Sequence, residues 1–202
     1  MRDSNALKKA SEELEKETEF FKFIQYKFFR QWSNLKKYAN DKGVEIIGDM
    51  PIYVSYDSVE AWVSPELFQF DEECTPTAVA GCPPDAFAAT GQLWGNPLYD
   101  WKTGYKWWID RLQFSASIYD IVRIDHFRGF ESYYAVPYGD ETAENGEWRK
   151  GPGAELFKAA EKALGKLNII AEDLGFITED VYKMLADVGY PGMKILQFAF
   201  GE

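Results

Sequence analysis

One pattern constrains the fold more than any other: a helical segment precedes a short apolar run that ends in an acidic residue, three times along the chain. The apolar runs are "VEIIGDMP", "YDIVRIDHF" and "LNIIAEDLG". Residues 20–41, 105–117 and 154–166 precede them with apolar side chains at three- and four-residue spacing, which predicts helices, and Gly43 follows the first as a stop signal. Parallel strands need a crossover connection and are buried on both faces, so the alternation predicts parallel β/α units.

A fourth unit is predicted at the end of the chain. Residues 178–189, "TEDVYKMLADVG", indicate a helix with Thr178 as its N-cap and two acidic residues near its N-terminus. The apolar run "MKILQFAF", residues 193–200, is then expected to be a fourth strand.

Two architectures can accommodate such units, an open doubly wound sheet and a (β/α)8 barrel. Nucleotide-binding open sheets usually carry a glycine-rich turn after the first strand, and the chain has neither a G-x-G-x-x-G nor a Walker sequence. Instead, the three apolar runs end in Asp49, Asp125 and Glu172. Barrel enzymes draw catalytic groups from several strand ends on one face. We therefore expect an α/β fold, specifically a partial (β/α)8 TIM barrel of about four consecutive units.

A long insertion follows the first expected strand. Residues 49–103 far exceed the usual connection of about two to six residues, and they are rich in Trp, Pro and Gly. Such loops are usually functional or disordered, and this composition favours function. Residues 129–152 form a second long loop. Aromatic residues make up 17% of the chain, which fits either a large core or a surface that binds flat-faced ligands.

The charge excludes some classes of partner. The net charge of −11 and the pI of about 4.7 argue against nucleic acid, whose phosphates require concentrated Lys and Arg. The sequence contains neither an apolar run of about 18 residues nor a secretory signal, so no membrane partner is expected. Cys74 and Cys82 have no nearby histidine and are interpreted as free thiols, which together with the missing signal predicts a cytoplasmic protein.

The acidic strand ends suggest a chemistry. Residues two apart on a strand share a face, so Arg123 and Asp125 should point the same way and the guanidinium should favour the ionised carboxylate. Glu172 would stand beside Asp125 on the rim of a barrel. One carboxylate held ionised and one able to carry a proton are what glycosidic-bond cleavage requires. A separation of about 5–5.5 Å would give a retaining double displacement.

Each of these residues also has a purely structural interpretation. Arg123 and Asp125 could form a structural ion pair, His126 could be a satisfied polar residue, Glu172 could cap a helix and Asp49 could begin a turn. The three acids could also bind a divalent cation through hard oxygen ligands. Two arginines near the acids already neutralise them, which argues against a metal.

An ordered set of motifs resembles one family. From about residue 20 to the last residue, the chain is similar to the 4-α-glucanotransferases, also called amylomaltases, of glycoside hydrolase family 77. The motifs that carry this resemblance are "GDMPIYV", "GCPPDAFAATGQLWGNPLYDW", "RIDHFRGF", "GPG", "IIAEDLG" and "PGMKILQFAF".

The resemblance implies roles for individual residues. Asp125 would be the nucleophile and Glu172 the general acid/base, while Arg123 and His126 would orient the nucleophile and bind the donor sugar. The remaining substrate-binding residues would lie near the donor subsite or on a loop over the glucan: Asp49, Tyr53, Asp85, Phe87, Gln92, Trp94 and Asn96.

The resemblance also implies a reaction. Such enzymes cleave an α-1,4 bond in a glucan or maltooligosaccharide and pass the glucanyl unit to the 4-hydroxyl of another sugar, without a metal or organic cofactor. A neutral glucan partner is compatible with a strongly acidic protein. The alternatives are an α-amylase-type hydrolase and a non-catalytic glucan-binding fragment.

The chain departs from the family pattern in two respects. Ala88 and Ala89 stand where members often have Ser and Glu, and the Thr-His-Asp-Asn motif with the third acid does not occur. We therefore expect residues 1–202 to be an internal fragment of one (β/α)8 catalytic domain, with 49–103 as its substrate-loop insertion. Such a fragment should be inactive alone and, with open strand edges, should self-associate.

Overall fold

The chain divides into two compact units, Met1–Ile46 and Ile47–Glu202. The computed structural model describes residues 3–200, except for the side chain of Phe198. The first unit consists of α1 (Ser4–Glu13) and α2 (Glu15–Asp41).

Helix α2 confirms the helix predicted over residues 20–41 and extends it toward the N-terminus by one turn and more. Its apolar side chains recur at three- and four-residue spacing, and Glu15 and Glu17 lie in the first turn, where the helix dipole favours acidic groups. Gly43, at φ +74°, adopts the left-handed conformation with which helices commonly end.

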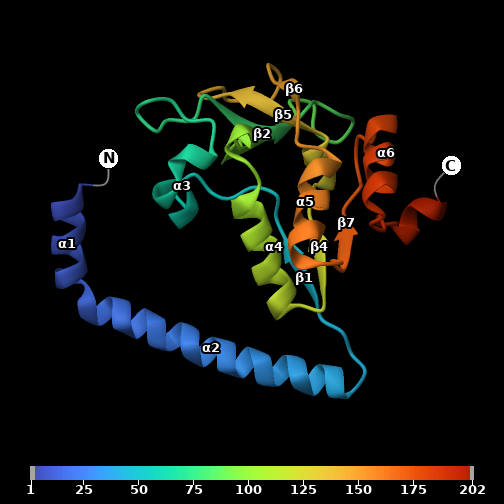
Figure 1. Cartoon of the computed structure of the whole chain (residues 1–202). Helices are drawn as coiled ribbons and strands as arrows, with labels where there is room; N and C mark the ends of the chain where they lie inside the picture. Colours follow the sequence, from blue (N-terminus) through green and yellow to red (C-terminus); the bar gives the residue numbers. More distant parts are fainter. Residues whose placement is uncertain (1–2, 201–202) are drawn as a thin grey trace. The chain divides into compact units, whose positions relative to one another are not determined.

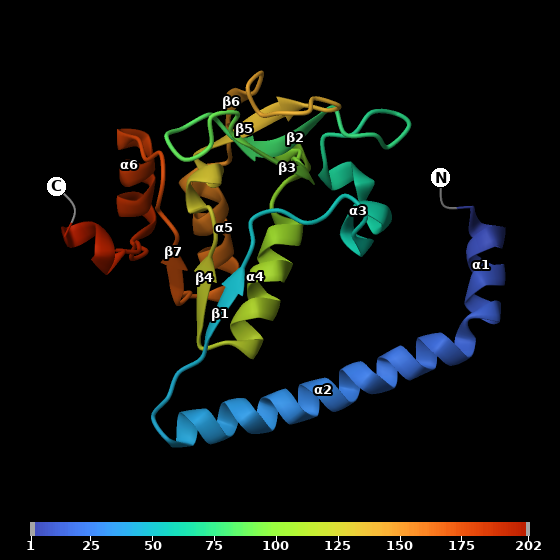
Figure 2. The same cartoon turned by 180° about the vertical axis from the view of Figure 1, so that it is seen from behind.

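Three parallel strands form the base of the second unit. They are β1 (Ile47–Met50), β4 (Ile121–Ile124) and β7 (Ile169–Ala171), in the order β1-β4-β7. Helices α4 (Lys106–Ile118) and α5 (Ala154–Leu164) cover one face of this sheet (Figures 1 and 2). Three of the predicted parallel strands are therefore confirmed, and so are the three helices that precede them, α2, α4 and α5.

The fourth predicted strand is wrong. Helix α6 (Glu179–Val188) forms as predicted, although the Thr178 hydroxyl at its N-cap makes no capping hydrogen bond. Beyond it, however, Leu196–Phe200 is a 3-10 helix, η4, with Leu196 71% and Phe200 82% exposed. A parallel strand normally has neighbours that bury both faces, and none of the described residues form a strand beyond β7.

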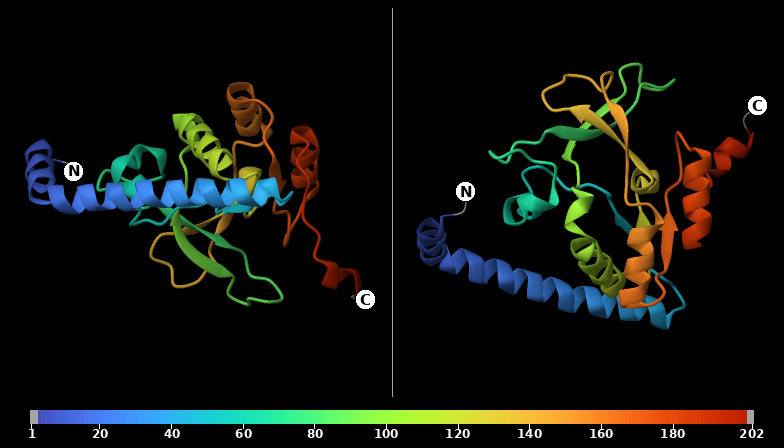
Figure 3. Two further views of the ribbon diagram at one scale, coloured as in Figure 1. Left: turned by 90° about the horizontal axis from the view of Figure 1, so that it is seen from below. Right: turned by 45° about the horizontal axis from the view of Figure 1, so that its top comes forward.

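A second sheet arises from the two segments expected to be long loops, 49–103 and 129–152. It is antiparallel, with the order β3-β2-β5-β6, and it lies beyond the carboxyl ends of the parallel strands, on the side away from α4–α6 in the view from below (Figures 1 and 3). Its strands are β2 (Ala78–Cys82), β3 (Gln92–Pro97), β5 (Ser132–Pro137) and β6 (Glu147–Lys150).

Short helices complete this unit. They are α3 (Val59–Val63), η1 (Pro65–Leu67), η2 (Trp101–Thr103) and η3 (Phe127–Phe130). The α/β class is confirmed, but neither sheet closes on itself within the described residues.

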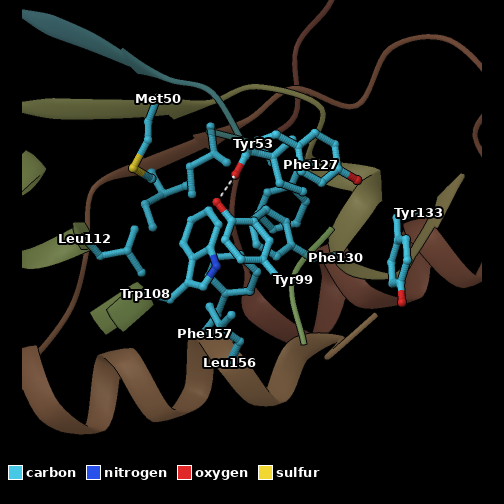
Figure 4. Close-up of a cluster of buried hydrophobic side chains, with 14 of the residues drawn as sticks. Met50, Tyr53, Tyr99, Trp108, Leu112, Phe127, Phe130, Tyr133, Leu156 and Phe157 are labelled. Atoms are coloured by element: carbon cyan, nitrogen blue, oxygen red, sulfur yellow. Dashed lines mark hydrogen bonds between the residues drawn. The ribbon is translucent and has the colours of Figure 1, made fainter. Parts of the chain in front are cut away.

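An aromatic core fixes the segment that follows β4. Phe130 packs edge-to-face on Trp108 and Phe157, with ring centroids 4.9 Å apart in both pairs. Tyr99 packs beside Trp108 and donates a hydrogen bond to the Ile52 carbonyl at 2.8 Å (Figure 4). Many of the abundant aromatic residues are thus core residues, and they join α4, α5 and η3 into one rigid support for the strand ends.

Candidate active site

An arginine joins two of the predicted acids at the ends of β1 and β4. Parallel pairing places Asp49 opposite Arg123. The guanidinium donates from Nη1 to Asp49 Oδ1 at 2.6 Å and from Nη2 to Asp125 Oδ1 at 2.9 Å. Burial lowers the pKa of Arg123, but hydrogen bonds and charge attraction from both carboxylates outweigh it and raise the pKa overall. The predicted common orientation of Arg123 and Asp125 is confirmed.

The Glu172 carboxylate is buried between the segments that follow β4 and β7. Main-chain hydrogen bonds fix it there, because Glu172 N donates to the Ile124 carbonyl and Phe127 N donates to the Glu172 carbonyl, both at 3.0 Å. The side chain accepts from His126 N at 2.8 Å through Oε2 and from Leu174 N at 2.9 Å through Oε1. Both carboxylate oxygens therefore have a backbone N–H donor beside the loop that carries Asp125.

The His126 backbone has an unusual conformation that makes this contact. With φ 49° and ψ 48° it is left-handed, one of two non-glycine residues with positive φ in the described chain. Its ring lies perpendicular to Trp94 at 4.8 Å, and Nε2 is buried without a hydrogen-bond partner among the described residues. Burial, with repulsion from Arg128, lowers the pKa of His126 to about 4 against the attraction of Asp125, so the imidazole is neutral at pH 7.

A cavity of about 170 Å³ opens between these residues and the loop after β1. Asn96 Nδ2 donates to the Val54 carbonyl at 2.9 Å and so holds that loop. Tyr53 lies 6.2 Å from Trp94, and burial raises the pKa of its hydroxyl. The lining residues are Pro51, Ile52, Tyr53, Trp94, Asn96, Asp125 and His126, five of which the sequence pointed to.

Six predicted residues do not line this cavity. Asp49, Arg123 and Glu172 are described above, and the other three are Asp85, Phe87 and Gln92. Asp85 Oδ1 accepts from Phe87 N at 2.8 Å and from Ala88 N at 2.7 Å, which closes a tight turn between β2 and β3. Phe87, on that turn, is 97% exposed. Gln92 Oε1 accepts from Trp94 Nε1 at 3.1 Å and so orients the indole that borders the cavity.

Arg128 is the second of the two arginines expected from the sequence to neutralise the acids, but its hydrogen bonds go to other groups. Its guanidinium carbon lies 3.8 Å from the Trp148 ring centroid, Nη2 donates to Ser132 Oγ at 2.9 Å, and Nη1 donates to the Phe176 carbonyl. Arg128 thereby links the segment after β4 to β6 and to the loop after Glu172. Only its position, five residues after Arg123 in "RIDHFRGF", could have suggested this.

The described residues contain neither a metal-binding group nor a membrane-spanning helix. No group of three or more His, Cys, Asp and Glu side chains is arranged to hold a metal ion. Nor is any helix of residues 3–200 both long and apolar enough to cross a membrane.

Comparisons with known proteins agree on one family. Residues 1–202 match the model of the family described as 4-alpha-glucanotransferase. The chain is 58% identical over 98% of its length to the 4-alpha-glucanotransferase of Streptococcus pneumoniae, and 52% identical over 100% to that of Clostridium butyricum. It covers 40% and 42% of these proteins.

A solved structure shows the same similarity. Amylomaltase from Streptococcus agalactiae in complex with acarbose matches 98% of this chain with a TM-score of 0.94 and 48% sequence identity. The match covers 41% of that protein, so the chain spans about two fifths of the length of the relatives it matches.

Proposed function

The chain belongs to the 4-alpha-glucanotransferase family, and from this premise we propose that the whole protein transfers α-1,4-glucan segments between glucans. The observation that carries the proposal is the cluster at adjacent strand ends. Arg123 holds Asp125 at the end of β4, and two backbone N–H groups hold Glu172 at the end of β7. One carboxylate is paired with a cation and the other is buried, which suits two different roles.

In the proposed reaction Asp125 is the nucleophile. Its carboxylate attacks the anomeric carbon, the bond to the leaving-group oxygen breaks, and Glu172 gives that oxygen its proton. A glycosyl ester of Asp125 results. Glu172, now ionised, removes the proton from the 4-hydroxyl of an acceptor sugar, which attacks the anomeric carbon and releases Asp125. Two inversions give net retention.

We propose that α-1,4-glucans or maltooligosaccharides occupy the cavity beside Asp125. The rings of Tyr53 and Trp94 suit the apolar faces of sugars, and the free His126 Nε2 suits a hydroxyl. The exposed Phe87 turn would lie over the glucan and exclude water, which favours a sugar acceptor. Neither nucleic acid nor a membrane has a part in this proposal, and neither does a metal or organic cofactor.

The proposed architecture is a (β/α)8 barrel of which this chain supplies consecutive β/α units. Residues 1–202 would belong to one catalytic domain, and 49–103 would be its substrate-loop insertion. The parallel order β1-β4-β7 and the placement of the acids at strand ends support this assignment. A cytoplasmic location is proposed because Cys74 and Cys82 are both free thiols.

The test uses the protein encoded by the longest reading frame that contains this chain, hereafter the encoded protein. Incubation with maltotriose should give glucose together with maltooligosaccharides longer than the substrate, and Asp125→Asn should abolish both. Glucose and maltose without chain lengthening would instead indicate a hydrolase, and wild-type protein that leaves maltotriose unchanged would refute the proposal.

A further inference from the structure

The turn that follows α6 is hydrogen-bonded to the two residues that flank Glu172 in the sequence. Ala171 N donates to the Pro191 carbonyl at 2.9 Å, and Met193 N donates to Asp173 Oδ1 at 2.7 Å. These two contacts flank Glu172 in the chain. The turn 189–193 is therefore held at the edge of the candidate active site, although it is exposed over Pro191 and Gly192.

Met193 connects this turn to Arg123 and, through Arg123, to the proposed nucleophile Asp125. Its sulfur accepts a hydrogen bond from Arg123 Nε at 3.2 Å, while Nη1 and Nη2 of the same guanidinium hold Asp49 and Asp125. All three guanidinium nitrogens thus have a partner. Of these three partners, Met193 is the one that does not lie at the end of β1 or β4. As a third contact, it fixes the orientation of the planar guanidinium.

We infer that Asp173 is a positioning residue for the nucleophile. It holds Met193 N, Met193 holds Arg123 Nε, and Arg123 holds Asp125, in an unbroken series of hydrogen bonds. Asp173 is adjacent to the proposed acid/base in sequence but has a different role, because its Oδ1 accepts the hydrogen bond from Met193 N in the turn. The expected effect on catalysis rests on the proposed function. The expected effect on the position of the Arg123 guanidinium rests on the contacts alone.

Gly192 shows how closely the turn approaches this carboxylate. A Cβ at position 192 would lie 2.6 Å from Asp173 Oδ1, inside any normal contact. Gly192 is not among the glycines with positive φ, so the absence of a side chain, rather than backbone freedom, is what the position requires. Gly192→Ala should therefore displace the Asp173 carboxylate without removing it.

Kinetics of the encoded protein on maltotriose test the series. Asp173→Ala should lower kcat by about 10- to 100-fold with KM changed less than about threefold, because misplacement of a reacting group mainly affects the chemical step. Asp173→Asn keeps an oxygen acceptor for Met193 N and should stay within about threefold of wild type.

Met193→Leu separates positioning from packing. It keeps the apolar volume but removes the sulfur acceptor, so Tm should be unchanged while kcat falls about three- to tenfold. Met184→Leu, the same change in the buried face of α6, is the matched control and should alter neither. If Met193→Leu behaves like Met184→Leu, the inference is wrong.

A double variant tests whether Gly192 and Asp173 act through one contact. Gly192→Ala alone should resemble Asp173→Ala, and the double variant should be no slower than the worse single variant. Losses that multiply would overturn the inference, as would a wild-type kcat for Asp173→Ala.

A crystal structure of Asp173→Ala gives a readout that needs no activity. The Arg123–Met193 contact should be lost, and the Arg123–Asp125 distance should exceed about 3.5 Å. An unchanged guanidinium would overturn the inference even if transfer is slow. Failure of the proposed function is seen separately, as wild-type protein that does not lengthen maltotriose.

Discussion

At the scale of single residues, Glu172 combines burial with two backbone N–H donors, and its proposed role is to move one proton. Glu172→Ala in the encoded protein should lower kcat on maltotriose by about 10²- to 10⁴-fold, the usual contribution of a general acid. α-Maltosyl fluoride should lose far less in its first step, because fluoride departs without protonation. Rapid quenching of the first turnover with both substrates makes the comparison. Equal losses would contradict the assignment of Glu172 as the acid.

His126 should make stability depend on pH. Burial lowers its pKa to about 4, whereas an unfolded histidine titrates near 6.5, so protons bind the unfolded chain first. The contribution of the neutral ring to the free energy of unfolding is therefore fully present above about pH 6.5, and it is lost as the pH falls toward 4. His126→Asn tolerates the left-handed backbone and lacks this titration.

The measurement is the free energy of unfolding of the 202-residue chain at pH 7.5 and 4.5, under conditions where it is monomeric. Wild type should lose about 2.5 kcal/mol more than His126→Asn between these values. His126 is the only histidine in the chain, so the difference isolates its ring. An equal loss in both proteins would show that the ring titrates normally.

The residues that the sequence could predict are those whose position follows from strand periodicity. Asp49, Arg123 and Asp125 belong to this class, because each lies at or directly after the end of an apolar run and alternation fixes its face. The contact between Arg123 and Met193 spans 70 positions and depends on a turn with no sequence periodicity. Neither local pattern nor propensity contains that information.

At the scale of elements, the Arg128 side chain links η3, β6 and the loop after β7. Arg128→Lys should cost about 2–4 kcal/mol of stability, since an ammonium cannot stack on Trp148 while bonding two further groups. Thermal or urea unfolding measures this. Arg30→Lys, at an exposed position in α2, is the control and should change stability by less than about 0.5 kcal/mol. Comparable effects would mean that Arg128 contributes only charge.

The turn between β2 and β3 presents Phe87 to solvent. Because 97% of its surface is exposed, Phe87→Ala should leave Tm unchanged. In the proposed role it should raise KM for long maltooligosaccharides about threefold or more and increase the share of hydrolysis, since one sugar-facing ring is lost. Product analysis of the encoded protein with maltoheptaose measures both. Phe114→Ala, another exposed phenylalanine, is the matched control.

Elements with a strong period were predictable and the others were not. The helices α2, α4, α5 and α6 carry clear apolar spacing, and the three parallel strands are continuous apolar runs. The antiparallel strands contain Gly, Pro or charged residues in runs of four to six, so their composition indicated loops. The run at 193–200 was misassigned because an apolar stretch alone does not reveal whether a neighbouring strand exists to pair with it.

At the scale of the whole molecule, strand pairing decides how the 202-residue chain should behave alone. Within the described residues β1 pairs only with β4, and Ile47 on β1 is 55% exposed. Leu196 and Phe200 are exposed as well. Strand edges and apolar surface of this kind favour pairing with another copy. Sedimentation velocity should therefore show a concentration-dependent increase in mass, whereas a monomer at all concentrations would contradict the expectation.

The same chain should also lack transferase activity. It has Asp125 and Glu172, but it lacks the Thr-His-Asp-Asn motif that, by the family resemblance, carries the third acid. Chemistry that depends on all three carboxylates should be slowed beyond detection, even where the cluster around Arg123 is intact. Maltotriose incubated with the chain should remain unchanged while the encoded protein lengthens it. Turnover by the chain that disappears with Asp125→Asn would show that two acids on this scaffold suffice.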